Sequence, residues 1–248
     1  MISLSKVSKS FDEAPALKDI NLEIAKSEVI AVLGQSGSGK STLLRLINLL
    51  EVSDKGKFEL AGDDTGLLSP AAIKSLQSRI AYIPQGLGLV QRLSALENVL
   101  QGASSRLFFP RLGIASYPSK MREEAMEALG QLGLKDLALR RVDTLSGGEK
   151  QRVAIARCLM QKLILLLADE PISSVDPVTA KRILTILRSV SRNLGIPVVI
   201  ALHQPEAAKE FADRIVGLRK GRLLFDLDSK KVNSKHIEKL YSKSRTSR

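Results

Sequence analysis

The chain has 248 residues, of which 44% are hydrophobic and 26% charged, a balance that is typical of a soluble globular protein with one large domain. No apolar run approaches the roughly 20 residues that span a bilayer, and the first residues lack the apolar core of a signal peptide, so we expect a cytosolic protein. The single cysteine, Cys158, excludes an internal disulfide and is expected to be a small buried residue.

The formal net charge of +12 is unevenly distributed along the chain. Residues 229–248 hold seven Lys or Arg and one Glu, so this basic tail carries half of the net charge. Such a tail can attract nucleic acid or an anionic membrane surface, although most are only solvated. Tryptophan is absent and no aromatic residues are interleaved through basic patches, which argues against a stacking platform for single-stranded nucleic acid.

Strand-like runs recur along the chain. They lie at 2–7, 21–24, 29–34, 79–84, 163–169, 198–202, 214–218 and 222–226. The runs beginning at 29, 163 and 198 are continuously apolar, as expected of strands buried on both faces of a parallel sheet. Helical stretches near 40–50, 147–161, 178–193 and 205–211 alternate with them. This order predicts an α/β fold with a mainly parallel sheet, in which the early and late alternating strands form a small antiparallel edge.

Residues 88–144 differ from the rest of the chain. They contain no buried strand pattern, and the helical patches SALENVLQ (94–101) and KMREEAMEALGQLG (120–133) flank a loop. We expect a helical subdomain inserted into the α/β core.

The stretch GQSGSGKST (34–42) matches the phosphate-loop pattern G-x-x-x-x-G-K-[ST], and it follows an apolar strand and opens a helix. Its glycines let backbone N–H groups wrap phosphate oxygens. Lys40 supplies a positive charge for the β and γ phosphates, and the Ser41 hydroxyl is a ligand for Mg²⁺. The pattern therefore predicts a nucleotide site.

Two further apolar strands end in polar residues. In LILLLADEP, Asp169 lies at the carboxyl end of a strand and suits a Mg²⁺ shell, and Glu170 is placed to orient or deprotonate a water molecule. His203 ends VVIALH, where it would reach a γ phosphate; by position alone a structural role is equally compatible.

The stretch LSGGEKQRVAIAR (145–157) begins a helix with two glycines. Ser146 and Glu149 have the spacing of a capping box, which leaves Gly147 and Gly148 unexplained. A helix N-terminus without bulky side chains is an anion site, so a phosphate is expected to dock there.

Taken in order, these motifs resemble those of the ATP-binding subunits of ABC transporters over about residues 2–226. GQSGSGKST resembles the Walker A motif, LLLADEP the Walker B motif, LSGGE the signature, Gln85 in AYIPQ the Q-loop, SSVD (173–176) the D-loop, and His203 the switch histidine. The resemblance implies an ABC ATPase fold: a P-loop NTPase core with an inserted helical subdomain. It implies an ABC ATPase domain over 1–228, followed by the basic tail at 229–248.

The resemblance also assigns site residues. Catalysis is implied for Glu170, His203 and Lys40, and Mg²⁺ binding for Ser41, Gln85 and Asp169. ATP binding is implied for Phe11 (stacked on adenine), Gly34, Gln35, Ser36, Gly37, Ser38, Gly39, Lys40, Ser41, Thr42, Gln85, Ser146, Gly147, Gly148, Glu149 and Asp176.

The partners that the resemblance implies are a second ATP-binding subunit and separate membrane-spanning permease subunits. The two ATP-binding subunits pair head-to-tail, so that the signature of one closes on ATP held by the Walker A motif of the other; a homodimer is expected. The permease docks on the helical subdomain beside the Q-loop, where the LFFPRLG loop (107–113) offers apolar contact. The chain would then lie at the cytoplasmic face of the inner membrane, with a substrate-binding protein as an indirect partner and no nucleic acid.

Segments over residues 79–226 resemble most the ATPases of phosphonate importers. Two places depart from that subfamily: Gly86-Leu87-Gly88 follows Gln85, and Lys162-Leu163 precedes the Walker B strand. An importer ATPase for another small solute, such as an amino acid or phosphate, remains the alternative. A soluble ABC ATPase acting on nucleic acid, a kinase-like P-loop enzyme and a non-hydrolysing module are less consistent with the single ATPase domain, the signature and the presence of Glu170 and His203.

Overall fold

The computed structural model describes residues 2–107 and 113–242, which divide into two compact units. Residues 1–73 and 197–248 belong to the first unit and residues 74–196 to the second, with the division inside helix α2 (Pro70–Gln77). Most of the LFFPRLG loop (107–113) and the end of the basic tail lie outside the described residues.

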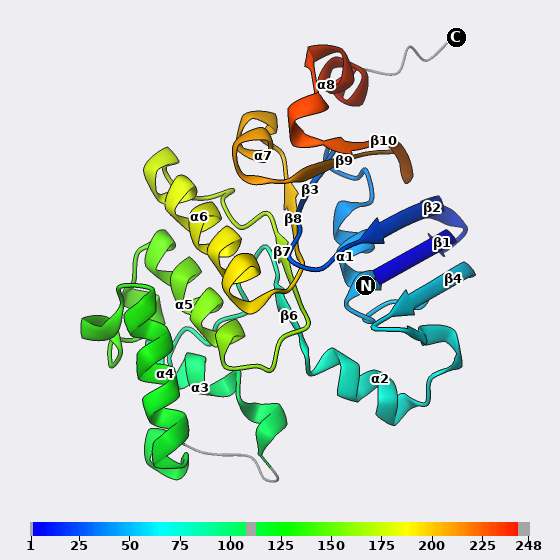
Figure 1. Ribbon diagram of the computed structural model, residues 1–248. Coiled ribbons are helices and arrows are strands. Elements are labelled where there is room, and N and C mark those ends of the chain that lie inside the picture. Colours follow the sequence, from blue (N-terminus) through cyan, green and yellow to red (C-terminus); the bar gives the residue numbers. More distant parts are fainter. Residues whose placement is uncertain (1, 108–112, 243–248) are drawn as a thin grey trace. The chain divides into compact units, whose positions relative to one another are not determined.

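The first unit contains two groups of strands (Figure 1). One is an antiparallel sheet in the order β2-β1-β4-β5, and its strands are β1 (Ile2–Phe11), β2 (Ala14–Ile24), β4 (Lys55–Leu60) and β5 (Asp63–Asp64). The other has the order β10-β9-β3-β8, and its strands are β3 (Val29–Leu33), β8 (Val198–Leu202), β9 (Arg214–Arg219) and β10 (Arg222–Asp228). Here β3 runs parallel to both β8 and β9, whereas β10 is antiparallel to β9.

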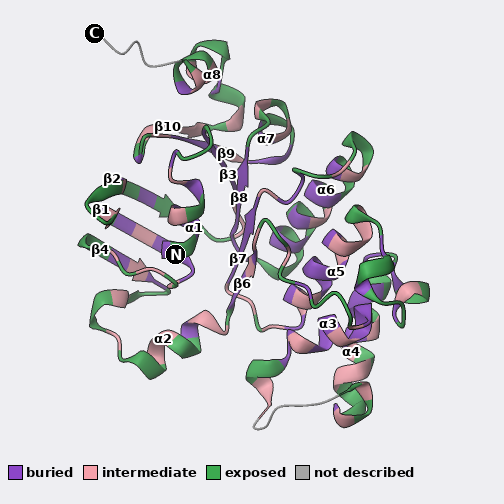
Figure 2. Cartoon of the chain, turned by 180° about the vertical axis from the view of Figure 1, so that it is seen from behind, coloured by how far each residue is buried: buried purple, intermediate pink, exposed green. Residues whose placement is uncertain are grey.

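These pairings confirm the predicted strands and refine the expected antiparallel edge. The early strands do form an antiparallel sheet, but it is completed by β4, which the sequence pattern did not predict. Of the late strands, β9 joins the parallel group beside β3. Every residue of β3 and β8 is buried, which explains their continuously apolar sequences (Figure 2).

Short helices follow the strands of the first unit. They are α1 (Lys40–Ile47), α7 (Pro205–Phe211) and α8 (Ser234–Tyr241). Helix α1 ends earlier than the predicted 40–50, because Asn48 caps it and Leu49 has a φ of 58°. The basic tail is partly folded: α8 begins at the capping residue Asn233 and buries Leu240 completely.

The second unit combines two parallel strands, β6 (Ile80–Ile83) and β7 (Leu165–Asp169), with a group of helices. The helices are α3 (Ala95–Gln101), α4 (Ser119–Gln131), α5 (Gly147–Leu159) and α6 (Pro177–Leu194). Residues 88–107 and 113–144 hold α3, α4 and short 3₁₀ turns but no strand, as the pattern predicted. Helix α6 is amphipathic, with one buried and one exposed face, whereas every residue of α5 except Gly147 is buried or half-buried (Figure 2).

Buried contacts fix α3 to the loop before it and to α5. The Asn98 amide is fully buried, accepts a hydrogen bond from the Val90 N–H (2.8 Å) and donates to the carbonyls of Val90 and Ser94 (both 3.0 Å). Gly102, directly after α3, lies so close to α5 that an added Cβ would be 2.0 Å from the Arg157 carbonyl oxygen. Cys158 on α5 is buried, which raises the pKa of its thiol to about 12, so it is the inert core residue expected.

The contact at Gly102 gives a matched pair of substitutions. Gly102→Ala should destabilise the chain by about 2 kcal/mol or more, because the clash is with backbone that cannot move without displacing α5. Gly130→Ala in α4 meets no atom within 4 Å and should stabilise by up to about 1 kcal/mol through helix propensity. Urea denaturation followed by circular dichroism measures both, and equal midpoints for the two variants would contradict the close packing.

Candidate functional site

The phosphate loop of the first unit connects β3 to α1. Gly39 precedes the helix with a φ of 105°, and a Cβ there would lie 2.6 Å from the Ala16 carbonyl oxygen, so both conformation and space require glycine. The loop is closed by hydrogen bonds from the Ser38 N–H to the Gln35 carbonyl (3.1 Å) and from the Gly221 N–H to the Ser38 carbonyl (3.0 Å). The free N–H groups at the start of α1 therefore lie next to a preformed loop that has few bulky side chains.

Lys40 is buried and curls back over this loop. Its Nζ donates to the carbonyls of Gly34 (3.0 Å) and Gln35 (3.2 Å). The hydroxyl of Ser38 is also buried, and it has no hydrogen-bond partner among the described residues. A buried cation and an unpartnered hydroxyl beside a helix N-terminus suit an anionic ligand, since a phosphate would satisfy both.

His203 emerges beside the phosphate loop because β3 and β8 are parallel neighbours. Leu33 pairs with Leu202, so Gly34 and His203 are the next residues at the same edge. The histidine side chain is exposed, and its backbone carbonyl accepts a hydrogen bond from the Tyr241 hydroxyl (3.1 Å). Phe11, at the end of β1, is 41% exposed, and the Lys9 ammonium lies 5.3 Å from its ring centroid.

In the second unit, the parallel pair β6 and β7 brings the Q-loop and the Walker B residues together. Ile83 pairs with Ala168, so the chain segments that follow leave at the same edge. Gln85 Nε2 donates to Glu170 Oε2 (3.1 Å), and the Tyr82 hydroxyl donates to Asp169 Oδ2 (3.4 Å). Glu170 has a φ of 51°, a left-handed conformation that is costly for a non-glycine residue and that it shares with Leu87 after the Q-loop.

The Asp169 carboxylate is compatible with a cation ligand. It is buried, and its Oδ1 has no hydrogen-bond partner within the described part of the chain. An unpartnered buried carboxylate oxygen is costly unless a cation or a water molecule satisfies it. Carboxylate and hydroxyl oxygens are the ligands that Mg²⁺ prefers, so Asp169 and Ser41 fit that ion by chemistry.

The capping box at the start of α5 is confirmed. The Ser146 hydroxyl accepts from the Glu149 N–H (3.3 Å), and Glu149 Oε2 accepts from the Ser146 N–H (2.7 Å). The hydrogen bond from the Ser146 backbone lowers the pKa of Glu149, so the cap is charged at neutral pH. Asp176 caps α6 in a similar way, accepting from the N–H groups of Val178 and Thr179 (both 3.0 Å).

The two signature glycines have different surroundings. A Cβ on Gly148 would lie 2.5 Å from Thr179 Cγ2, so packing inside the chain already explains this glycine. A Cβ on Gly147 would meet only ordinary contacts, with the Ser174 carbonyl oxygen at 3.6 Å and Val175 Cγ1 at 3.8 Å. Gly147 is therefore the glycine whose small size the fold of the chain does not require.

Sequence reasoning missed two residues of the second unit. Tyr82 contacts the Walker B aspartate from a strand position that reads only as a β-former. Arg157, the last residue of the quoted signature stretch, donates to the Leu87 carbonyl (2.7 Å) and to the Gly88 carbonyl. Both acceptors belong to the unusual Gly86-Leu87-Gly88 segment, where Leu87 and Gly88 have positive φ values. The signature helix thus holds the turn that follows Gln85.

Residues 17–173 match the ABC transporter family. The chain belongs to this family. It is an ABC ATPase, which binds ATP and couples its hydrolysis to transport. Within the described residues, no helix is long and apolar enough to cross a membrane.

Similar proteins cover nearly all of the chain. A phosphonates import ATP-binding protein of Nocardia farcinica is 42% identical over 98% of this chain and 90% of its own length. A phosphate-import ATP-binding protein of Mycolicibacterium smegmatis is 46% identical, covering 89% and 84%. A hypophosphite import ATP-binding protein of Stutzerimonas stutzeri is 39% identical, covering 97% and 70%. The Nocardia alignment extends past residue 228, into the tail that the sequence motifs did not cover.

Solved structures of ATP-binding cassettes have the same fold. A dimeric ATP-binding cassette in a post-hydrolysis state with ADP and Pi has a TM-score of 0.80 and 31% identity, covering 92% of this chain and 99% of its own. The fold and family expected from the motifs are confirmed.

Proposed function

We propose that this chain is the ATP-hydrolysing subunit of an importer for phosphonate or a related phosphorus oxyanion. The observation that carries the substrate class is that the relatives above, aligned over most of their length, are named for import of phosphonates, phosphate and hypophosphite. All three are small phosphorus oxyanions. Permease subunits would hold the chain at the cytoplasmic face of the inner membrane, and a substrate-binding protein would choose the solute.

Lys40 and the backbone N–H groups of residues 34–42 bind the β and γ phosphates of ATP, and Phe11 stacks on the adenine. Ser41, Gln85 and Asp169 would hold Mg²⁺, which would supply charge neutralisation at the phosphates. Glu170 orients the attacking water and accepts its proton. The water oxygen forms a bond to the γ phosphorus, the bond from that phosphorus to the bridging oxygen breaks, and ADP leaves. His203 donates a hydrogen bond to the γ phosphate.

The capped start of α5 completes the site from a second copy of the chain, paired head-to-tail. Gly147 and Gly148 present backbone N–H groups and Ser146 presents its hydroxyl to the γ phosphate, while Glu149 keeps the helix start formed and Asp176 holds the D-loop. The space at Gly147 supports this arrangement, because that glycine leaves the helix start open to a ligand from outside the chain.

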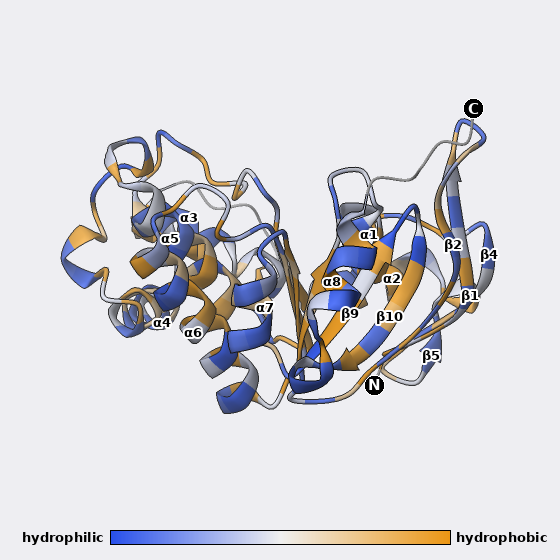
Figure 3. Cartoon of the chain, turned by 90° about the horizontal axis from the view of Figure 1, so that it is seen from above, coloured by the Kyte–Doolittle hydropathy of each residue, from blue (hydrophilic) through white to orange (hydrophobic). Residues whose placement is uncertain are grey.

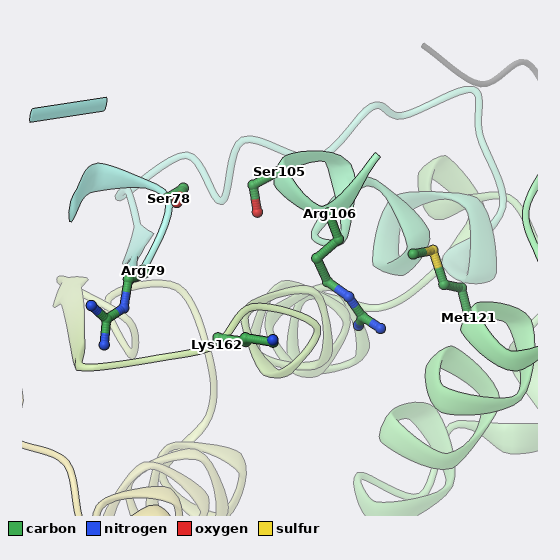
Figure 4. A pocket seen from close by; sticks show the side chains of 6 residues that line it. All are labelled: Ser78, Arg79, Ser105, Arg106, Met121 and Lys162. Carbon is green, nitrogen blue, oxygen red and sulfur yellow. The ribbon is translucent and has the colours of Figure 1, made fainter. Parts of the chain in front are cut away.

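A cavity in the second unit supports a permease-docking role. It has a volume of about 570 Å³ and is lined by Ser78, Arg79, Ser105, Arg106, Met121 and Lys162 (Figure 4). Arg106 is paired with Glu124, with 3.2 Å between Nη2 and Oε1. Arg79 and Lys162 form no ion pair within the described residues, so the cavity favours an acidic segment. Lys162 is part of Lys162-Leu163, one of the two segments in which the sequence departs from the phosphonate subfamily.

Glu170→Gln tests the catalytic assignment. The amide retains an oxygen that can accept from Gln85 but no longer takes a proton from water. We expect kcat to fall by about 10²- to 10⁴-fold. ATP affinity should stay within about twofold of wild type, as uniform binding is kept. Phosphate release and fluorescent-nucleotide titration measure the two quantities, and size-exclusion chromatography should show an ATP-bound dimer. Undiminished turnover would rule out Glu170 as the base.

Gly147→Asp tests the head-to-tail dimer. A carboxylate at this position fits within the chain but places negative charge where the partner's γ phosphate docks. We expect ATP binding by the monomer to persist and kcat to drop by about two orders of magnitude. Gly147→Ala adds a Cβ without charge and should show a smaller loss. Equal rates for wild type and Gly147→Asp would show that α5 does not face phosphate.

The substrate is tested by growth of a deletion strain on a single phosphorus source: an alkylphosphonate, phosphate or hypophosphite. Loss on phosphonate alone, restored by the wild-type chain but not by Glu170→Gln, supports the proposal. Loss on phosphate or hypophosphite alone moves the substrate within the class. Unchanged growth on all three, in a host without a redundant importer, contradicts it.

A further inference from the structure

Residues 229–242, the described part of the basic tail, fold onto the phosphate-loop side of the first unit. After β10 the chain turns and forms α8, which lies along β9 (Figure 3). The helix begins with a capping box between Asn233 and His236, whose ring lies 5.4 Å from that of Phe225, centroid to centroid. Leu240 is fully buried beneath the helix. The last turn of α8 is therefore fixed in place rather than a solvated extension.

Side chains from the nucleotide site cap the end of α8. The last carbonyls of a helix lack partners within the helix and need external donors. Arg219, at the end of β9, donates from Nη1 to the Lys239 carbonyl (2.6 Å) and from Nη2 to the Ser242 carbonyl (2.8 Å). Gln35 of the phosphate loop donates from Nε2 to the Tyr241 carbonyl (2.8 Å). The Walker A loop and α8 thus hold each other.

The side chain of Tyr241 makes a second link. Its hydroxyl donates to the backbone carbonyl of His203 (3.1 Å), the residue directly after β8. Burial raises the pKa of Tyr241, a hydrogen bond with the Gly34 backbone partly opposes this rise, and the nearby Glu206 charge adds to it. The hydroxyl is therefore protonated at neutral pH and keeps its donor. One residue of α8 consequently contacts both Gln35 and His203.

We propose that Tyr241 is a positioning residue for ATP hydrolysis, through which α8 fixes the backbone of His203 and of the phosphate loop. The inference rests on the proposed contact of His203 with the γ phosphate. A histidine that must meet a phosphate within hydrogen-bond distance gains from a fixed backbone, because small displacements weaken the contact steeply. Tyr241 touches no ATP itself and acts through His203 and the phosphate loop.

We call Gln35, Arg219 and Tyr241 the strap, because their hydrogen bonds tie α8 to the first unit. Through Gln35, the strap also contacts Lys40. The carbonyl of Gln35 accepts from Lys40 Nζ, and its side chain binds the end of α8. A cavity of about 90 Å³ between the loop and Ser242 is lined by Gln35, Ser36, Gly37, Ser38, Arg219 and Lys220 as well. The two basic side chains add positive charge beside the loop, a contribution that must be separated from the positioning role.

Tyr241→Phe is the first test, in the full-length chain with ATP and Mg²⁺. The ring keeps its packing, and the hydroxyl loses its bonds to the His203 carbonyl and to the Gly34 backbone of the phosphate loop. We expect kcat to fall about three- to tenfold, as the loss of these hydrogen bonds allows, while the KM for ATP stays within about twofold. Lys235→Ala, on the exposed side of α8, is the control and should retain the wild-type kcat. A variant that only loosened the fold would lower the melting temperature without this split between kcat and KM.

Two further variants keep the test decisive. Arg219→Lys retains the charge beside the loop but cannot span two carbonyls, so it should lower kcat as Tyr241→Phe does, and it serves if Tyr241→Phe does not fold. In a His203→Ala background, adding Tyr241→Phe should cause a smaller further loss than in the wild type, because part of the route runs through His203.

Wild-type kcat, or a raised kcat, in both Tyr241→Phe and Arg219→Lys would overturn the strap. A full additional loss in the His203→Ala background would also overturn it. If His203→Ala itself hydrolyses ATP at the wild-type rate, the proposed role of His203 fails, and the route through it fails as well. If His203→Ala is inactive while both strap variants are normal, only the strap fails.

Discussion

Parallel pairing of fully buried strands is the constraint on which the site depends. In the first unit, β3 and β8 pair with Leu33 opposite Leu202, and in the second, β6 and β7 pair with Ile83 opposite Ala168. Parallel strands deliver the segments that follow them to the same edge. The phosphate loop and His203 are therefore neighbours, and so are Gln85 and Glu170, although each pair is far apart in sequence. The apolar sequences of β3, β7 and β8 stabilise this pairing, because both faces of each strand are buried.

Much of this arrangement could be predicted from the sequence because it depends on local signals. The phosphate loop, the capping box and the apolar strands each have a pattern contained in a dozen residues or fewer. The strand and the contacts that were not predicted from the sequence have no such local pattern. Strand β4 (KGKFEL) carries exposed polar residues and buries only Phe58 and Leu60, so its pairing with β1 decides its conformation. Tyr82 and Arg157 gain their roles only from the packing of the second unit.

The signature shows why a motif is not a uniform set of ligands. Gly148 faces Thr179 of α6 within the same chain, whereas Gly147 has room for a side chain. One glycine therefore serves helix packing and the other leaves the helix N-terminus accessible. Sequence alone presents them as an identical pair, and the distinction needs the position of α6. The same helix also reaches the turn after Gln85 through Arg157, so the signature and the Q-loop are mechanically linked inside the second unit.

The contacts of α8 change the interpretation of the basic tail. Its charge suggested an attraction to anionic partners, yet the contacts that anchor α8 use backbone carbonyls and the Tyr241 hydroxyl rather than the tail's own cations. The donors come from Arg219 and Gln35, which belong to the ATPase core. The C-terminal end of a helix attracts cationic donors because its carbonyls carry partial negative charge. A core that already concentrates positive charge for phosphate thus provides the docking point for α8.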